Sequence, residues 1–118
     1  MTQFSNNNYD LEERTAKFGE DIIEFCKNIE QNAITRPIIS QLIRSGTSIG
    51  ANYMEANGAA TKKDLRHKLT LCRKEAKESS YWLKLISKQN PASYKVAAGL
   101  AKESYELTLI FSTILKKI

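Results

Sequence analysis

The side chains in this sequence that are best suited to chemistry are its cations. Residues 61–88 carry nine Lys and Arg residues against three acids. A row of four, with spacings of 7, 4 and 7 residues, falls within about 40° on a helix surface: Arg66, Arg73, Lys77 and Lys84. Such a row is suited to contacting successive phosphates of a nucleic-acid backbone. The alternative is a solvated flank with intrahelical pairs such as Lys74–Glu78.

The charge of the whole chain is also unevenly distributed, with the positive charge in the part that contains this row. The formal net charge is +5, with −4 in residues 1–33 and +9 in residues 34–118. A basic segment attracts polyanions, but charge alone does not name the partner. No aromatic-basic motif of the common RNA-binding modules is present. Tyr81 lies near the cationic row, where it could stack on a base or make an interhelical hydrogen bond.

Residues for catalysis or metal binding are scarce. The chain has two cysteines, Cys26 and Cys72, and one histidine, His67. This is too few for a zinc site or a disulfide framework, so we expect both cysteines to be buried, reduced packing residues. No nucleophile–base pair or pair of carboxylates can be assembled. We therefore expect no enzymatic activity, no metal and no cofactor.

Asn52 and Glu55 are a further polar pair. They are three residues apart and therefore project from nearly one face of a helix. We predict a polar network that fixes helix register. Solvated surface residues, or a ligand-binding role, are the alternatives.

The segment that contains this pair, RSGTSIGANYMEANG (44–58), has unusually few large side chains. Gly46 and Gly50 each cost about 1 kcal/mol relative to alanine inside a helix. A phosphate-binding loop is excluded, because the preceding residues have helical periodicity and no lysine follows Gly50 as that motif requires. We predict close approach by another helix, with Gly50 available for contact with a second subunit.

An apolar sector of the same basic segment is the other candidate for a subunit contact. Leu71, Trp82 and Leu85 fall roughly opposite the expected core seam. An exposed sector with a tryptophan is typical of an interface. Binding of a partner protein or plain packing within the bundle are the alternatives.

The apolar residues that must position these side chains form four series with alternating steps of three and four. The series run through residues 11–29, 39–56, 65–86 and 97–118, and they predict four helices. The connections are short, so consecutive helices should be antiparallel. The sequence therefore predicts an all-α, up-down-up-down, left-handed four-helix bundle over residues 9–118, preceded by a flexible arm at 1–8.

Helix-capping and helix-terminating residues agree with these boundaries. Thr35 and Thr61 are expected to cap the second and third helices. Asn57-Gly58 is expected to end the second helix through a left-handed residue. Asn90 is expected to cap the fourth, with Pro91 in its first position.

The chain has no apolar run near the roughly 20 residues of a membrane span. Its N-terminus is polar and acidic, unlike a secretory signal. We expect a cytoplasmic protein with no membrane partner.

The segment of residues 41–86 resembles the 23S rRNA intervening-sequence proteins, also called the four-helix-bundle protein family. That family carries S-I-x-A-N-x-x-E on one helix and a basic start to the next, and KEAKESSYWLKLI (74–86) matches a frequent version of its third helix. The matching positions here are Ser48, Ile49, Ala51, Asn52, Glu55, Lys62, Lys63 and Asp64. Gly50 stands where many members have proline.

The resemblance implies a ring-like homopentamer with a positive surface and no known enzymatic activity. It also implies RNA, or a nucleic-acid–protein complex such as one with a reverse transcriptase, as partner. Lys62 and Lys63 join the cationic row as candidate contacts. Our leading hypothesis is a non-enzymatic oligomer that binds structured RNA or DNA electrostatically, as an accessory scaffold. The alternative is a protein–protein interaction scaffold that does not bind nucleic acid.

Overall fold

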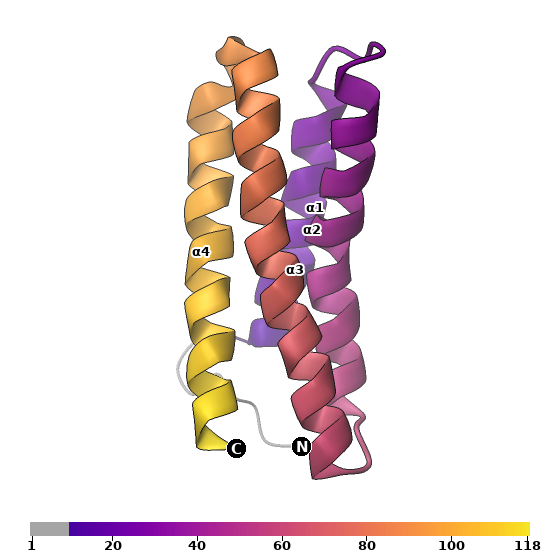
Figure 1. The fold of residues 1–118 in the computed structure, drawn as a ribbon, viewed down its shortest axis with the longest axis vertical. Coiled ribbons are helices and arrows are strands. Elements are labelled where there is room, and N and C mark those ends of the chain that lie inside the picture. The colour runs from indigo at the N-terminus through magenta and orange to yellow at the C-terminus, as the bar shows by residue number, and fades with distance from the viewer. Residues whose placement is uncertain (1–9) are drawn as a thin grey trace.

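The computed structural model describes residues 10–118 as a bundle of four long helices, 44 × 25 × 20 Å in extent (Figure 1). The helices are α1 (Leu11–Lys27), α2 (Thr35–Asn57), α3 (Lys62–Gln89) and α4 (Tyr94–Lys117), with a 3-10 turn η1 (Pro91–Ser93) before α4. This confirms the predicted all-α four-helix bundle. The left-handed twist stays a prediction, and the predicted arm at 1–8 lies outside the described residues.

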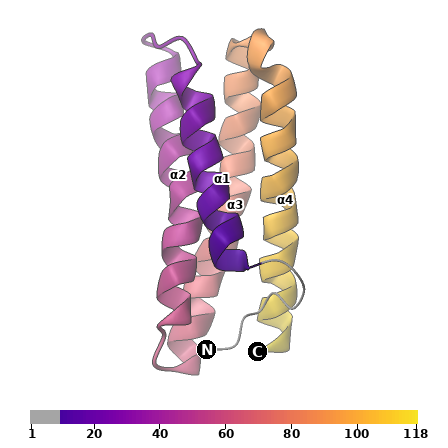
Figure 2. The ribbon, with the colours of Figure 1, turned by 180° about the vertical axis from the view of Figure 1, so that it is seen from behind.

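Each helix packs against the next one along the chain and runs antiparallel to it. Between α2 and α3, Ser45 pairs with Ser79 and Glu55 with Lys68. Helix α1 packs mainly on α2, and its contact with α4 is much sparser. Figure 2 shows α1 leaning from α4 at its N-terminal end toward α2 at its C-terminal end. Among residues 10–118, no helix is long and apolar enough to cross a bilayer.

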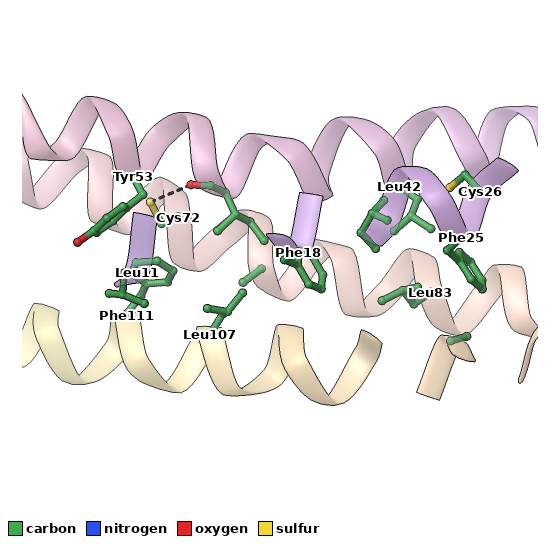
Figure 3. Packing of buried hydrophobic residues seen from close by; sticks show 14 of the residues in the cluster. Leu11, Phe18, Phe25, Cys26, Leu42, Tyr53, Cys72, Leu83, Leu107 and Phe111 are labelled. Atoms are coloured by element: carbon green, nitrogen blue, oxygen red, sulfur yellow. Dashed lines mark hydrogen bonds between the residues drawn. The ribbon is translucent and has the colours of Figure 1, made fainter. Parts of the chain in front are cut away.

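The core is one continuous apolar cluster that all four helices build (Figure 3). Its members follow the three-and-four spacing of the sequence; Phe18, Leu42, Leu83 and Phe111 are each 2% exposed or less. Burying side chains of this size stabilises a fold by about 1.5–3 kcal/mol each. The positions of the core residues were therefore well predicted by periodicity.

Cys26 and Cys72 are buried, free thiols, as predicted. Burial raises the pKa of Cys26 to about 11 and that of Cys72 to about 12. Near neutral pH both are protonated and poorly reactive, because the thiolate is the nucleophile. Within residues 10–118, no group of three or more His, Cys, Asp and Glu side chains is placed to hold a metal ion.

Glycines let α1 and α2 approach closely. A Cβ atom at Gly46 would lie 2.9 Å from Cγ1 and 3.2 Å from Cβ of Ile22, closer than the packing tolerates. A Cβ at Gly50 would lie 3.4 Å from the carbonyl oxygen of Thr15. The predicted close approach is therefore confirmed. Gly50 faces α1 within the bundle, which accounts for the glycine by itself; its contact with a second subunit stays a prediction.

The positions of the helix ends were predicted more accurately than the hydrogen bonds that cap them. Helix α3 begins as expected, with Thr61 Oγ1 accepting from Asp64 N at 3.0 Å. Helix α2 ends at Asn57 as expected, but Gly58 has φ −97° and is not left-handed. Its N–H instead donates to Glu55 O at 3.1 Å, so the last turn tightens in a 3-10 manner.

Two other predicted caps differ from the structure. Asn32, and not Thr35, caps α2: its Oδ1 accepts from the backbone N–H groups of Ile34 and Thr35 at 2.8 and 2.9 Å. Thr35 lies inside the first turn, where its hydroxyl donates to Glu30 O. Asn90 makes no side-chain cap; its carbonyl accepts from Ser93 N, and Pro91 starts η1 instead of α4.

Candidate nucleic-acid interface

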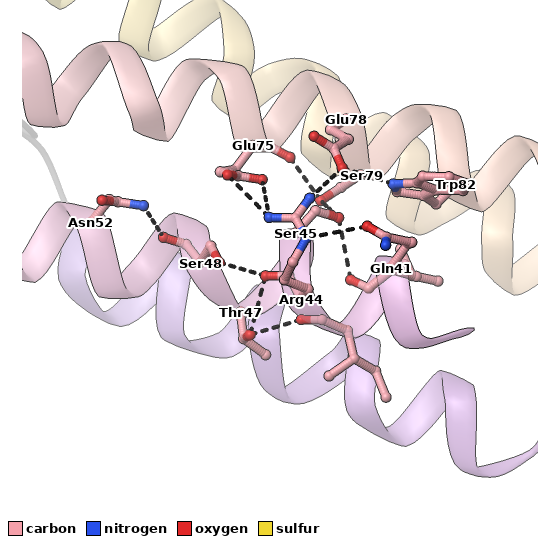
Figure 4. Close-up of polar contacts among 12 residues, drawn as sticks. Gln41, Arg44, Ser45, Thr47, Ser48, Asn52, Glu75, Glu78, Ser79 and Trp82 are labelled. Atoms are coloured by element: carbon pink, nitrogen blue, oxygen red, sulfur yellow. Dashed lines mark hydrogen bonds and ion pairs between the residues drawn. The ribbon is translucent and has the colours of Figure 1, made fainter. Parts of the chain in front are cut away.

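Helix α3 has an acidic flank that faces α2 (Figure 4). Arg44 of α2 reaches Glu75 at 3.2 Å and also pairs with Glu78. Glu78 accepts a second hydrogen bond from Trp82 Nε1 at 3.0 Å. That bond, together with Arg44, holds the pKa of Glu78 below its usual range. The proposed Lys74–Glu78 pair is therefore replaced by an interhelical one.

Below these ion pairs, Ser79 Oγ donates to Ser45 Oγ at 3.0 Å, with both side chains fully buried. This hydroxyl pair and the Arg44 cluster join α2 to α3. Sequence reasoning missed both. The available signals were an arginine inside the small-residue segment of α2 and two carboxylates three residues apart on α3.

Asn52 and Glu55 do not form the predicted polar network with each other. Asn52 is half-buried, and its Nδ2 donates to Ser48 O of its own helix at 2.9 Å. The Glu55 side chain is 55% exposed and pairs with Lys68 at 2.6 Å. The pair points toward the solvated edge of α2, so each residue finds a separate partner. Glu55–Lys68 nevertheless contributes to the register between α2 and α3.

The opposite flank of α3 faces α4 and carries the cationic row. Ser80, on this side, forms a hydrogen bond between its Oγ and Ser104 Oγ of α4. Lys77 and Lys84 are exposed and Arg73 is half-buried. None of these three has an ion pair or side-chain hydrogen bond within residues 10–118. Five other cations in that range are paired with carboxylates: Arg14, Lys17, Lys27, Arg44 and Lys68.

Arg66 differs from the rest of its row. Its guanidinium donates to the backbone oxygens of Leu115 (3.4 Å) and Ile118 at the end of α4. A cation there satisfies carbonyls that have no helical partner and complements the helix dipole. Arg66 thus fixes α4 against α3. Lys62 and Lys63, at the start of α3, are exposed and have no ion pair among the described residues.

Helix α4 adds exposed aromatic side chains beside the row. Glu103 contacts Arg14 of α1 at 2.7 Å on one side of α4. Tyr105 projects from the other side, next to Ser104 and α3, and is 60% exposed. Leu109 and Lys102 share this side, being four and three residues away. We call the combined surface the α3–α4 face; it comprises Arg73, Lys77, Tyr81, Lys84, Lys102, Tyr105 and Leu109.

Sequence reasoning found the α3 half of this face but missed the α4 half. The signal was a second helical series on α4, with spacings of 8, 3 and 4 residues, through Tyr94, Lys102, Tyr105 and Leu109. It runs beside the core series and was hidden by it, since Tyr and Leu are also ordinary core residues.

The predicted subunit-contact sector is more buried than expected. Trp82 is half-buried, packs against the core and is held by Glu78. Its ring centroid lies 4.9 Å from that of Tyr81 in an edge-on contact. Trp82 therefore packs against the bundle, and contact of its remaining exposed surface with a second subunit stays a prediction. Leu71 and Leu85 are also half-buried, and their contact with a second subunit stays a prediction.

A groove of about 1100 Å³ separates α1 from the first half of α4. Phe18, Phe25 and Ile29 line it from α1, and Val96 and Leu100 line it from α4. It opens where α1 diverges from α4, beyond the clamp between Arg14 and Glu103. The groove therefore has an apolar floor, although Lys17, Asp21, Glu24 and Lys95 also line it.

Comparisons with known proteins agree with this fold. A family model described as 23S rRNA-intervening sequence protein matches residues 7–113. A crystal structure of a protein of unknown function from the S23 ribosomal protein family of Bacteroides thetaiotaomicron VPI-5482 is 28% identical. The match covers 90% of this chain and 95% of that chain, with a TM-score of 0.77. A search of curated protein sequences gave no match. The chain belongs to the 23S rRNA-intervening sequence protein family.

Proposed function

We propose that this protein is a non-enzymatic, cytoplasmic RNA-binding bundle that holds the phosphate backbone of structured RNA on its α3–α4 face. The supporting observation is the state of its cations. Arg73, Lys77 and Lys84 have no acidic partner within residues 10–118, whereas three cations that lie between helices, Arg14, Arg44 and Lys68, are paired with carboxylates. Unpaired cations in a row attract a polyanion and release its counterions on binding.

The family name and the net charge point in the same direction. The family is named for an intervening sequence in 23S rRNA, which makes RNA the first nucleic acid to test, with DNA as the comparison. The formal charge of +5 favours association with either. The proposal assigns the chain no reaction of its own and places it as an accessory scaffold.

Self-association is part of the proposal. A ring of five copies would carry a formal charge of about +25 and would make weak contacts of each subunit cumulative. We expect light scattering at micromolar concentration to give a mass several times the 13.4 kDa of one chain. A particle of single-chain mass under those conditions would contradict the assembly.

Binding should depend steeply on salt. If three phosphates are neutralised per site, the association constant should fall by a factor of about 20 to 40 between 50 and 200 mM monovalent salt. Fluorescence anisotropy with a labelled RNA hairpin measures this directly. Absence of binding at 50 mM salt, or an affinity that salt does not change, would refute the proposal.

The apolar α1–α4 groove favours a second candidate, a protein–protein interaction scaffold without direct nucleic-acid binding. Its lining by Phe18, Phe25 and Leu100 is suited to a protein surface more than to a phosphate backbone. Under this alternative the α3–α4 cations only keep the protein in solution. The salt titration separates the two, because a scaffold of this kind would not retain RNA at 50 mM salt.

A further inference from the structure

The α3–α4 face carries aromatic rings as well as cations. Tyr105 is 60% exposed, Tyr81 is 55% exposed, and Tyr94, further along α4 beside the face, is 66% exposed. Leu109 adds an apolar side chain that is 49% exposed. Large apolar side chains in this number on one surface indicate a binding function.

The register between the two helices mixes the rings with the cations. Ser80 lies against Ser104 in the middle of the pair, and Arg66 lies against the end of α4. Because the helices are antiparallel, Lys77 is level with the turn of α4 that carries Tyr105. Lys84, about 10 Å further along α3, is level with the turn that precedes Lys102. Cations and rings thus alternate over the surface.

The Tyr81 ring is held in place by the neighbouring Trp82 side chain. Tyr81 meets the Trp82 ring edge-on, with 4.9 Å between centroids and 70° between planes. Trp82 is itself fixed by its hydrogen bond to Glu78. Tyr81 is therefore supported on one side and open to solvent on the other, which lowers the entropy cost of ordering it on a ligand.

We propose that the α3–α4 face binds unpaired RNA, with bases stacked on Tyr81 and Tyr105 and phosphates held by the cations between them. This inference rests on the proposed function and narrows its substrate. A ring on a straight helix cannot reach a base face inside a duplex, where the bases cover one another, but it can stack on a base in a loop or single strand. The target is thus the unpaired part of a structured RNA.

Charge disfavours a second copy of the same face as the occupant. In a two-fold contact, the cations Arg73, Lys77, Lys84 and Lys102 would face the same four cations of the second copy, with no acid on the face to offset them. In a ring, a different face of the neighbouring subunit could cover this one, and the particle mass of the Tyr105→Ala variant tests that contact. A strand of RNA supplies both the negative charges and the flat apolar surfaces that this face lacks.

Substitutions of Tyr105 test the inference. Tyr105→Ala should weaken binding to a single-stranded RNA at least about fivefold, since a base–aromatic stack is lost, and Tyr105→Phe should bind as the wild type does. Binding to a duplex RNA should change less than about twofold in both, and the salt dependence should be unchanged. Met54→Ala, at an exposed apolar side chain on α2, is the matched control and should have no effect.

Equal single-strand affinities of the Ala and Phe variants would overturn the inference. So would an equal loss on duplex RNA, or a lower particle mass of Tyr105→Ala, which would make the ring a protein contact. If RNA still binds in a salt-dependent manner in these cases, only the stacking inference fails. If no RNA binds at all, the proposed function fails with it.

Discussion

A leucine in place of Gly46 is expected to destabilise the bundle by about 3 kcal/mol or more. Even a Cβ atom at this position would lie 2.9 Å from Ile22 Cγ1, and leucine adds three further carbon atoms. Ile22 is fully buried, so it has no free space into which it can move. The expected gain in helix propensity, about 1 kcal/mol, cannot offset this clash. Urea unfolding followed by circular dichroism gives the free-energy difference.

Gly99 provides the matched control, because nothing lies within 4 Å of a Cβ atom there. Gly99→Leu makes the same chemical change in a helix interior that is open to solvent. It should leave stability unchanged or raise it by up to about 1 kcal/mol. If Gly46→Leu were no more destabilising than Gly99→Leu, the close approach of α1 to α2 would not explain the glycine.

The number, extent and buried faces of the helices could be predicted because one physical cause dominates them. A residue such as Leu42 or Phe111 is buried because it recurs at the three-and-four spacing that faces the axis. The scarcity of cysteine and histidine correctly predicted that Cys26 and Cys72 are free, buried thiols. The three-and-four spacing also showed that the segment with Gly46 and Gly50 is a helix whose small side chains allow close contact with a neighbouring helix.

Details at helix ends could not be predicted in this way, because several residues compete for the same backbone groups. Asn32 and Thr35 are both good capping residues, and the path of the preceding turn decides that Asn32 accepts the two N–H groups. At Gly58, glycine permits a left-handed conformation but does not require it. The choice depends on the following turn.

Only the α3 half of the candidate site could be predicted from the sequence. Ion pairs between helices depend on which flanks of the helices face each other, and the sequence does not show this. The spacing of Arg73, Lys77 and Lys84 is visible in the sequence, but their lack of partners is not. That follows from Glu75 and Glu78 lying on the α2 side of α3, where Arg44 binds them. On the other flank of α3, the packing of α4 binds Arg66 to the carbonyl groups at the end of α4. It also places Tyr105 beside the remaining cations of the row.

Reversing the charge of the row is expected to abolish most RNA binding. A triple variant with Arg73→Glu, Lys77→Glu and Lys84→Glu should bind RNA at least about 100-fold more weakly, because three phosphate contacts become repulsions. The salt dependence of the remaining binding should be correspondingly shallower. Each reversal changes the charge by two units, so the formal net charge falls from +5 to −1.

A second triple variant separates the row from the overall charge. Lys17→Glu, Lys27→Glu and Arg36→Glu change the net charge by the same amount, at exposed positions on α1 and α2. These residues lie on the other side of the bundle from the α3–α4 face. Circular dichroism and light scattering of both variants must match the wild type, so that a loss of binding reports the surface and not the fold or assembly.

The most direct measurement is the dissociation constant of one labelled RNA hairpin for both triple variants and the wild type at 50 mM salt. We predict a loss of at least about 100-fold for the α3 variant. For the α1–α2 variant we predict a loss of less than about fivefold, from the change in long-range attraction alone. Equal losses in the two variants would show that binding follows net charge, and would contradict a site on the α3–α4 face.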